Sequence, residues 1–216
     1  TSGDQNTAIG DVALFTNQTG KWNTALGALA DVSTTNLENA TAIGFGAIVD
    51  ASNKVRIGNT AVTVIEGQVA YTFPSDGRFK TNVTESVKGL DFIMKLRPVV
   101  YNLQAKNMDQ FKNGGLLNAK FSSTDYGPIE NIRQSGFIAQ EVEEAAIVSG
   151  YDFNGVKKPE SKNDTYGLAY SQFVVPLVKA VQEQQVVIKK QDEEIKKLKD
   201  KIEVLAKAVE KLSTNK

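Results

Sequence analysis

The stretch NTAIGDVA at residues 6–13 returns as NTALGALA at residues 23–30 and as TAIGFGA at residues 41–47. The copies share the pattern T-A-[I/L]-G-x-x-A with a period of 17 residues, and a degenerate copy, VRIG, follows at 55–58. Each copy alternates polar, small and branched residues before a glycine, which is typical of a short strand that ends in a turn. One copy carries too few apolar atoms to fold alone, so the repeats predict strands that are stacked on one another or shared between chains.

The chain after the repeats changes character twice. Residues 61–73 (AVTVIEGQVAYTF) alternate apolar and other residues on both sides of Gly67, which predicts two more strands. The middle of the chain mixes both periodicities. The elements predicted there are a helix at 87–96 ended by Pro98, a strand at 98–103, a long loop or insertion at 104–134, a strand running into a helix at 136–146, and a hairpin turn at Asn154-Gly155.

Residues 171–216 predict one long helix with a heptad pattern. The a positions are Val174, Val181, Ile188, Ile195, Ile202 and Val209, and the d positions are Leu177, Gln184, Gln191, Leu198, Leu205 and Leu212. Because proline fits the first turn of a helix, Pro176 places the start of the regular helix near Val175. β-Branched a residues with leucine at d favour two strands, whereas the two glutamines put polar layers into the seam. The pattern therefore predicts a parallel oligomer without deciding between a dimer and a trimer.

The composition excludes several classes of function. The 216 residues are 41% hydrophobic and 23% charged, as in folded proteins, and the formal net charge of zero gives no sign of a nucleic-acid or anionic-membrane partner. No apolar run is long enough for a membrane span. The absence of cysteine and histidine excludes thiol nucleophiles, Ser-His-Asp triads and thiolate or imidazole zinc sites, so no metal and no cofactor is predicted. Since the chain starts at Thr1, we interpret it as a fragment.

The stretch PSDGRFKTNV at residues 74–83 has two readings. Asp76-Gly77 is turn chemistry, so the stretch could be a solvated loop. Alternatively, Ser75 and Lys80 form a nucleophile and its base, one of the few dyads open to a chain without histidine or cysteine. An ammonium group cannot accept a proton, so this reading needs burial or a nearby cation to neutralise Lys80, and Arg78 is a candidate for that cation.

The second reading gains support from a family pattern, roughly S-D-x-R-x-K-x-N-[I/V]. Its fixed positions are met by Ser75, Asp76, Arg78, Lys80, Asn82 and Val83. Further matching stretches are GLDFIMKLRPVVYNL at 89–103, GFIAQEVE at 136–143 and YSQFVVPLVKAVQEQ at 170–184. Over about residues 75–190 the chain resembles the C-terminal intramolecular chaperone domain of phage tail spikes and tail fibres, a self-cleaving Ser-Lys peptidase family typified by endosialidases. Residues 1–60 resemble the β-roll heads of trimeric autotransporter adhesins and similar phage fibre modules.

The resemblance implies roles for individual residues. Ser75 matches the nucleophile and the first residue of the released fragment, Lys80 matches the general base, and the scissile bond is Pro74–Ser75. The positions of Asp76, Arg78 and Asn82 imply orientation or structural support. Gln140 and Glu141 match a recurrent pair to which no chemistry is assigned. The implied activity is that of a self-cleaving serine endopeptidase that acts once, within its own chain.

The expected fold is α+β with an all-β repeat stalk, in an intertwined homotrimer. The expected domains are a β-roll or β-prism head at 1–60, stalk strands at 61–74, a mixed α+β chaperone and auto-processing domain at 75–170, and a coiled-coil helix at 171–216. The expected partners are two further copies, the upstream β-structured fibre or stalk of the same polypeptide, and a host-surface glycan or receptor reached through the parent protein. The expected location is a virion tail fibre or a bacterial cell surface.

Two other functions compete with autoproteolysis. The domain at 75–170 could instead be a permanent, non-cleaving cap of a trimeric fibre or adhesin. A glycan hydrolase is disfavoured because no carboxylate pair of the glycosidase type stands out in the sequence.

Overall fold

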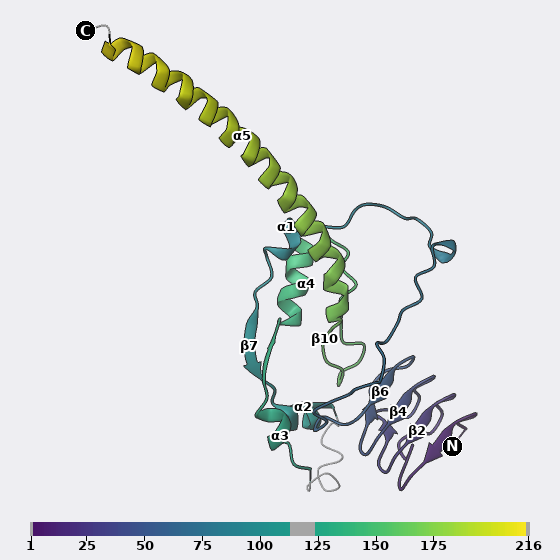
Figure 1. Cartoon of the computed structure of the whole chain (residues 1–216). Coiled ribbons are helices and arrows are strands. Elements are labelled where there is room, and N and C mark those ends of the chain that lie inside the picture. Colours follow the sequence, from purple (N-terminus) through teal and green to yellow (C-terminus); the bar gives the residue numbers. More distant parts are fainter. Residues whose placement is uncertain (1, 113–123, 215–216) are drawn as a thin grey trace. The chain divides into compact units, whose positions relative to one another are not determined.

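The computed structural model of the chain describes residues 2–112 and 124–214, and Figure 1 shows its helices and strands. The chain folds into two compact units, and each is built from segments that are far apart in sequence. The first unit comprises Thr1–Thr81, Pro98–Ala139 and Lys157–Gly167, and the second comprises Asn82–Arg97, Gln140–Val156 and Leu168–Lys216. The predicted mixed α+β class is confirmed, with a long helix at the C-terminal end.

The repeats form a parallel sheet in the first unit. Its four strands lie in the order β1-β2-β4-β6, and Figure 1 shows β2, β4 and β6 stacked side by side. The strands are β1 (Thr7–Ile9), β2 (Thr24–Leu26), β4 (Thr41–Ile43) and β6 (Val55–Ile57). Their register pairs Thr7 with Thr24, Thr24 with Thr41, and Thr41 with Val55. The predicted strand in each repeat is therefore confirmed. A second parallel pair, β3 (Asp31–Val32) and β5 (Ile48–Val49), was not predicted.

The small residues of the repeat face inward. Ala25 and Ala42 are buried at the centres of their strands, in a cluster of alanine and valine side chains. Asn23, also buried, accepts a hydrogen bond from the Ala40 N–H at 2.9 Å, so a polar side chain joins neighbouring coils. Gly27 has a φ of +132°, and a Cβ there would lie 2.8 Å from the carbonyl carbon of Gly44. The turn after each strand therefore needs glycine both for its backbone conformation and for space.

Residues 61–73 form no strand, so the strands predicted there are wrong for the single chain. Their alternating apolar side chains are exposed instead, with 81% of Val69, 78% of Tyr71 and 76% of Phe73 accessible. An alternating pattern gives a stable strand only where a neighbouring strand pairs with it and a core covers one face. Among the described residues, no strand pairs with this stretch and no core covers it.

The remainder of the first unit contains a β-ribbon and two helices. Strand β7 (Val99–Asn102) pairs antiparallel with β8 (Arg133–Gly136). The strand predicted at 98–103 is confirmed, and the one predicted from residue 136 lies slightly earlier. Helices α2 (Ala105–Lys112) and α3 (Gly127–Glu130) occupy part of the predicted loop at 104–134. That loop prediction is wrong for those residues, because the polar composition of α2 and the shortness of α3 hide both helices. The centre of the predicted loop lies outside the described residues.

The second unit is packed around aromatic rings. Phe92, on α1 (Leu90–Ile93), is fully buried. Its ring lies 5.3 Å from that of Tyr151, 4.9 Å from that of Phe153 and 6.5 Å from that of Phe173. The helix predicted at 87–96 is therefore present but short.

Two longer helices complete the second unit. They are α4 (Ala139–Val148) and α5 (Val174–Thr214), which follows the short helix η2 (Tyr170–Phe173). The predicted helix start near Val175 is confirmed. Glu183 on α5 accepts a hydrogen bond from the N–H of Leu90 at 2.8 Å and so caps α1. Among the described residues, no helix has the length and apolar character needed to cross a membrane.

The turn at Asn154-Gly155 has a different place from the one predicted. It directly precedes β9 (Val156–Lys157), which pairs with β10 (Gly167–Leu168). Residues 158–166 connect the two strands, so Asn154-Gly155 leads into a paired strand and is not the turn between the two.

Replacing Phe92 by alanine is expected to lower the free energy of unfolding of the second unit by about 3–5 kcal/mol, because it leaves a cavity among the rings. Met94, two residues along and 76% exposed, offers a matched control. Its alanine variant should change stability by less than about 0.5 kcal/mol. Urea titration followed by tyrosine fluorescence measures both, and equal effects of the two variants would contradict this packing.

Candidate functional site

Ser75 and Lys80 are brought together by one tight turn. The Nζ of Lys80 lies 2.7 Å from the Oγ of Ser75, within hydrogen-bond distance. Between them the chain forms the short 3₁₀ helix η1 (Gly77–Phe79). The N–H of Phe79 donates to the carbonyl of Asp76 at 3.1 Å, and the N–H of Lys80 donates to that of Gly77 at 3.2 Å. This turn reverses the chain and brings the two side chains to the same place.

Asp76 and Arg78 hold the turn in shape. An oxygen of Asp76 accepts the N–H of Arg78 at 2.9 Å and caps η1, while the guanidinium Nη2 lies 2.6 Å from the other oxygen. The side-chain hydrogen bonds between the two residues lower the pKa of Asp76 and raise the pKa of Arg78. The expectation that Arg78 acts as the cation beside Lys80 is not supported in the single chain, because a carboxylate already pairs with its charge.

The other predicted site residues lie in the second unit. Asn82, its first residue, has a left-handed backbone conformation with a φ of 54°, which asparagine adopts more readily than most residues. Gln140 and Glu141 lie in the first turn of α4. Glu141 accepts two hydrogen bonds from the guanidinium of Arg97, at 2.5 Å and 3.1 Å, and this pairing raises the pKa of Arg97. Glu141 therefore links α4 to the segment after α1.

The turn has the atoms that a proton transfer needs. The separation of 2.7 Å between Lys80 Nζ and Ser75 Oγ is a working distance for general base catalysis. Ser75 directly follows Pro74, so the carbonyl carbon that its Oγ would attack belongs to the adjacent peptide bond. Residues 62–86 are exposed throughout, so both groups are open to water in the single chain. Across the parts of the chain that the structure describes, no group of three or more His, Cys, Asp or Glu residues could hold a metal ion.

Large apolar side chains in and beside the turn are exposed to solvent. Phe79 is 82% exposed and Val83 is 79% exposed. The guanidinium of Arg78 lies 5.7 Å from the centre of the Phe79 ring. Together with the exposed stretch at 61–73, these side chains give the turn an apolar flank on both sides in sequence.

Sequence reasoning missed a buried group of charges elsewhere in the first unit. Its members are Asp50, Lys54, Lys112 and Asp164. Lys54 and Asp164 are separated by 110 residues in sequence, so no local pattern announces their contact. Asp50 lies between Val49 and Ala51, but Asp164 lies between Asn163 and Thr165, so local composition does not mark the group as buried.

Comparison with known proteins adds the family. Residues 75–151 match a family model described as chaperone of endosialidase, whose name also classes it as a peptidase. No curated protein and no solved structure matches the chain. The match begins at Ser75, the residue that the sequence pattern assigns as nucleophile. Residues 75–151 are therefore a domain of the endosialidase-chaperone family.

Proposed function

We propose that the chain is the trimerisation and folding chaperone of a fibre or surface adhesin, and that it cuts itself at Pro74–Ser75. The observation that carries this proposal is the contact of 2.7 Å between Lys80 Nζ and Ser75 Oγ, at the first residue of the family match. Ser-Lys pairs are an established alternative to the histidine-based triad, which this chain cannot build.

The proposed reaction has two steps. Neutral Lys80 accepts the proton of the Ser75 hydroxyl while Oγ attacks the carbonyl carbon of Pro74. The C–N bond breaks, the Ser75 nitrogen takes the proton, and an ester joins the acyl group of Pro74 to Oγ. Water then hydrolyses this ester, which leaves a carboxylate on Pro74 and a free N-terminus with its hydroxyl on Ser75. Backbone N–H groups have to stabilise the oxyanion in both steps.

The exposure of the turn supports activation by assembly. A lysine in water is protonated and cannot act as a base, whereas burial favours the neutral amine. The apolar side chains beside the turn, among them Tyr71, Phe73 and Phe79, are exposed in the single chain and would be buried by neighbouring copies. Trimer formation would then remove water from Ser75 and Lys80 together. Cleavage would follow folding, and release of the chaperone would make the folded stalk kinetically stable.

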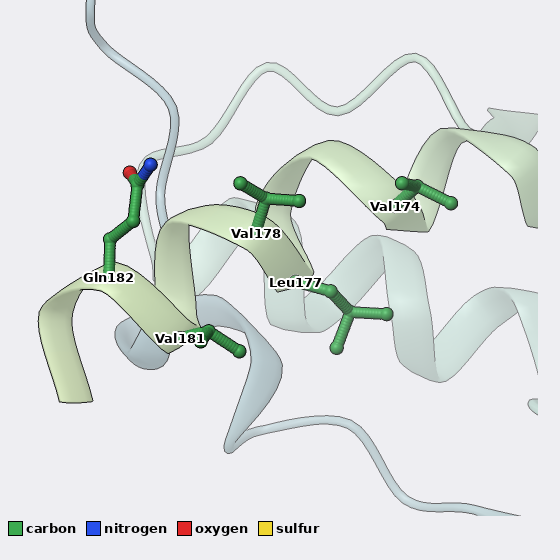
Figure 2. A pocket seen from close by; sticks show the side chains of 5 residues that line it. All are labelled: Val174, Leu177, Val178, Val181 and Gln182. Carbon is green, nitrogen blue, oxygen red and sulfur yellow. The ribbon is translucent and has the colours of Figure 1, made fainter. Parts of the chain in front are cut away.

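The long helix supports the trimer. On α5 the a and d side chains are exposed, including Ile195 at 47%, Ile202 at 64% and Leu205 at 64%. Near its start, Val174, Leu177, Val178, Val181 and Gln182 line a shallow, almost wholly apolar hollow of about 330 Å³, which Figure 2 shows from close by. An apolar stripe of this length is normally covered by another helix. Parallel copies of α5 would cover it and hold the upstream repeats together.

A mass spectrum of the purified, assembled protein tests the cleavage. We expect two species, residues 1–74 and residues 75–216, the second with serine at its N-terminus. Dilution below the dissociation constant of the trimer should slow the reaction, because the unassembled turn stays wet. An assembled protein that remains intact after prolonged incubation near neutral pH would leave the non-cleaving cap of a trimeric fibre as the function. In either case the parent protein would belong to a phage tail fibre or a bacterial surface.

A further inference from the structure

Four charged residues lie together in the first unit, three of them buried and Lys54 half-buried, and we call them the ionic cluster. Asp50, Asp164 and Lys112 are 1%, 3% and 8% exposed. The Nζ of Lys54 lies 2.5 Å from an oxygen of Asp50 and 3.1 Å from an oxygen of Asp164. The Nζ of Lys112 lies 3.5 Å from the second oxygen of Asp50. The two cations and two anions of the cluster compensate one another, and the more exposed Lys157 lies beside them with its Nζ 3.7 Å from Asp164.

The ionic cluster joins residues from both sides of the Pro74–Ser75 bond. Asp50 and Lys54 precede this bond, whereas Lys112 and Asp164 follow it. Two ion pairs thus connect what would become separate fragments, Lys54 with Asp164 and Asp50 with Lys112. The covalent connection is different in kind, because residues 62–86 are exposed throughout.

Two hydrogen bonds donated by hydroxyl groups cross the same boundary. The hydroxyl of Ser161 donates to the carbonyl oxygen of Asp50 at 3.2 Å. The hydroxyl of Thr60 donates to one oxygen of Asp109 at 3.0 Å, and the hydroxyl of Tyr126 donates to the other at 2.8 Å. Two segments of the downstream chain, around residues 109–112 and 161–164, therefore contact the end of the repeat sheet, and Tyr126 supports the first of them through Asp109.

We propose that residues 1–74 and 75–216 remain one complex after the cut, held together by the ionic cluster of Asp50, Lys54, Lys112 and Asp164. The cut itself rests on the proposed function, but the cluster does not. Cleavage then removes only the exposed connection, and release of the chaperone is a separate, slower event. The interaction surface is the C-terminal end of the repeat sheet, and its partner is the downstream fragment of the same chain.

The protonation of Asp164 is consistent with a lasting contact. Burial alone would raise its pKa, but the N–H groups of Glu160 and Thr165 and the ammonium of Lys54 outweigh burial and lower the pKa to about 2. The Asp164 carboxyl is therefore held in its ionised form, which favours its pairing with Lys54. Removing one partner of a buried charge pair mainly raises the dissociation rate, because the remaining charge is left without compensation.

The test separates fragment binding from autoproteolysis. In a Ser75→Ala background, residues 64–70, all exposed, are replaced by the recognition sequence of a site-specific protease, and that protease makes the cut. Denaturing electrophoresis shows that the chain is cut, and native size-exclusion chromatography shows whether the fragments travel together. We expect them to co-elute. If the two fragments with the wild-type ionic cluster separate at once, the proposal is overturned, whether or not the natural cut occurs.

A variant that keeps the net charge unchanged tests whether the ionic cluster holds the two fragments together. Asp164→Asn combined with Lys112→Met removes both ion pairs that cross the cut and leaves Asp50 paired with Lys54. We expect the cut fragments to dissociate about 30-fold faster or more. Glu160→Gln is the matched control, because Glu160 pairs with Lys157, which also contacts Asp164, so the change removes a charge beside the cluster but no ion pair that crosses the cut. Its dissociation rate should stay within about twofold of wild type.

Two checks keep this comparison decisive. The circular dichroism and the native mass of each uncut variant are measured first, so that loss of folding is not read as dissociation. If the double variant is folded and releases the fragments no faster than the Glu160→Gln control, the ionic cluster does not hold them. Failure of the wild-type chain to cut itself, with normal co-elution after the added protease, counts against the proposed function alone.

Discussion

Lys80→Arg is expected to leave the chain intact at Pro74–Ser75, although it preserves the positive charge. A guanidinium does not lose its proton in proteins, so arginine cannot accept the proton of the Ser75 hydroxyl. Loss of a general base lowers a rate by roughly 10²–10⁴-fold. The measurement is the fraction of cleaved chain against time, by mass spectrometry, at a protein concentration that keeps the chains assembled.

Two companion variants make the result interpretable. Ser75→Ala removes the attacking oxygen, so it should show no cleavage and gives the baseline of the assay. Its assembly should be unchanged. Lys189→Arg, an exposed lysine of α5 outside the predicted seam, should cleave like wild type. If Lys80→Arg cleaves nearly as fast as Lys189→Arg, a positive charge that shapes the loop is sufficient, and Lys80 is not the base.

Ile202→Asp is expected to break the assembly. In parallel helices the change places three carboxylates in one apolar layer, which costs at least several kcal/mol per trimer. Light scattering should give three times the chain mass of 23.4 kDa for wild type and a single chain mass for the variant. Lys197→Asp, at the outward c position of the preceding heptad, carries the same new side chain and should stay trimeric. An Ile202→Asp protein with unchanged mass and melting would refute the predicted seam. A wild-type dimer would mean that the preference of β-branched a residues and leucine d residues for two strands decides the assembly.

The repeat sheet could be predicted from sequence because local composition decides it. A period of 17 residues fixes which strands pair, and an alanine between threonine and isoleucine fixes which face is inside. Strands β3 and β5 escaped prediction because two residues each are too few to show alternation. The strands expected at residues 61–73 failed for a different reason: their alternating pattern is clear, but none of the described strands pairs with it.

The candidate site was predictable in part for similar reasons. Ser75 and Lys80 stand five apart, and the Asp76-Gly77 pair between them announces the turn that joins their side chains. Arg78 was expected to be the cation beside Lys80, but it pairs with Asp76. That contact depends on side-chain geometry, which the spacing of residues does not reveal. The ionic cluster was beyond reach, because its members meet only after the repeats, α2 and the 157–167 segment have folded together.

The equal spacing of the strands has a consequence for the history of such a protein. Because Thr7, Thr24 and Thr41 occupy equivalent places in the ladder, a duplication or loss of one whole unit keeps every inward alanine inward. The last step is shorter, yet Thr41 still pairs with Val55, so the far turn absorbs the missing residues and the strand does not. Recombination can therefore lengthen or shorten the array by whole repeats. A deletion of one residue inside a strand would instead turn its threonine and isoleucine into the core, and selection would remove it.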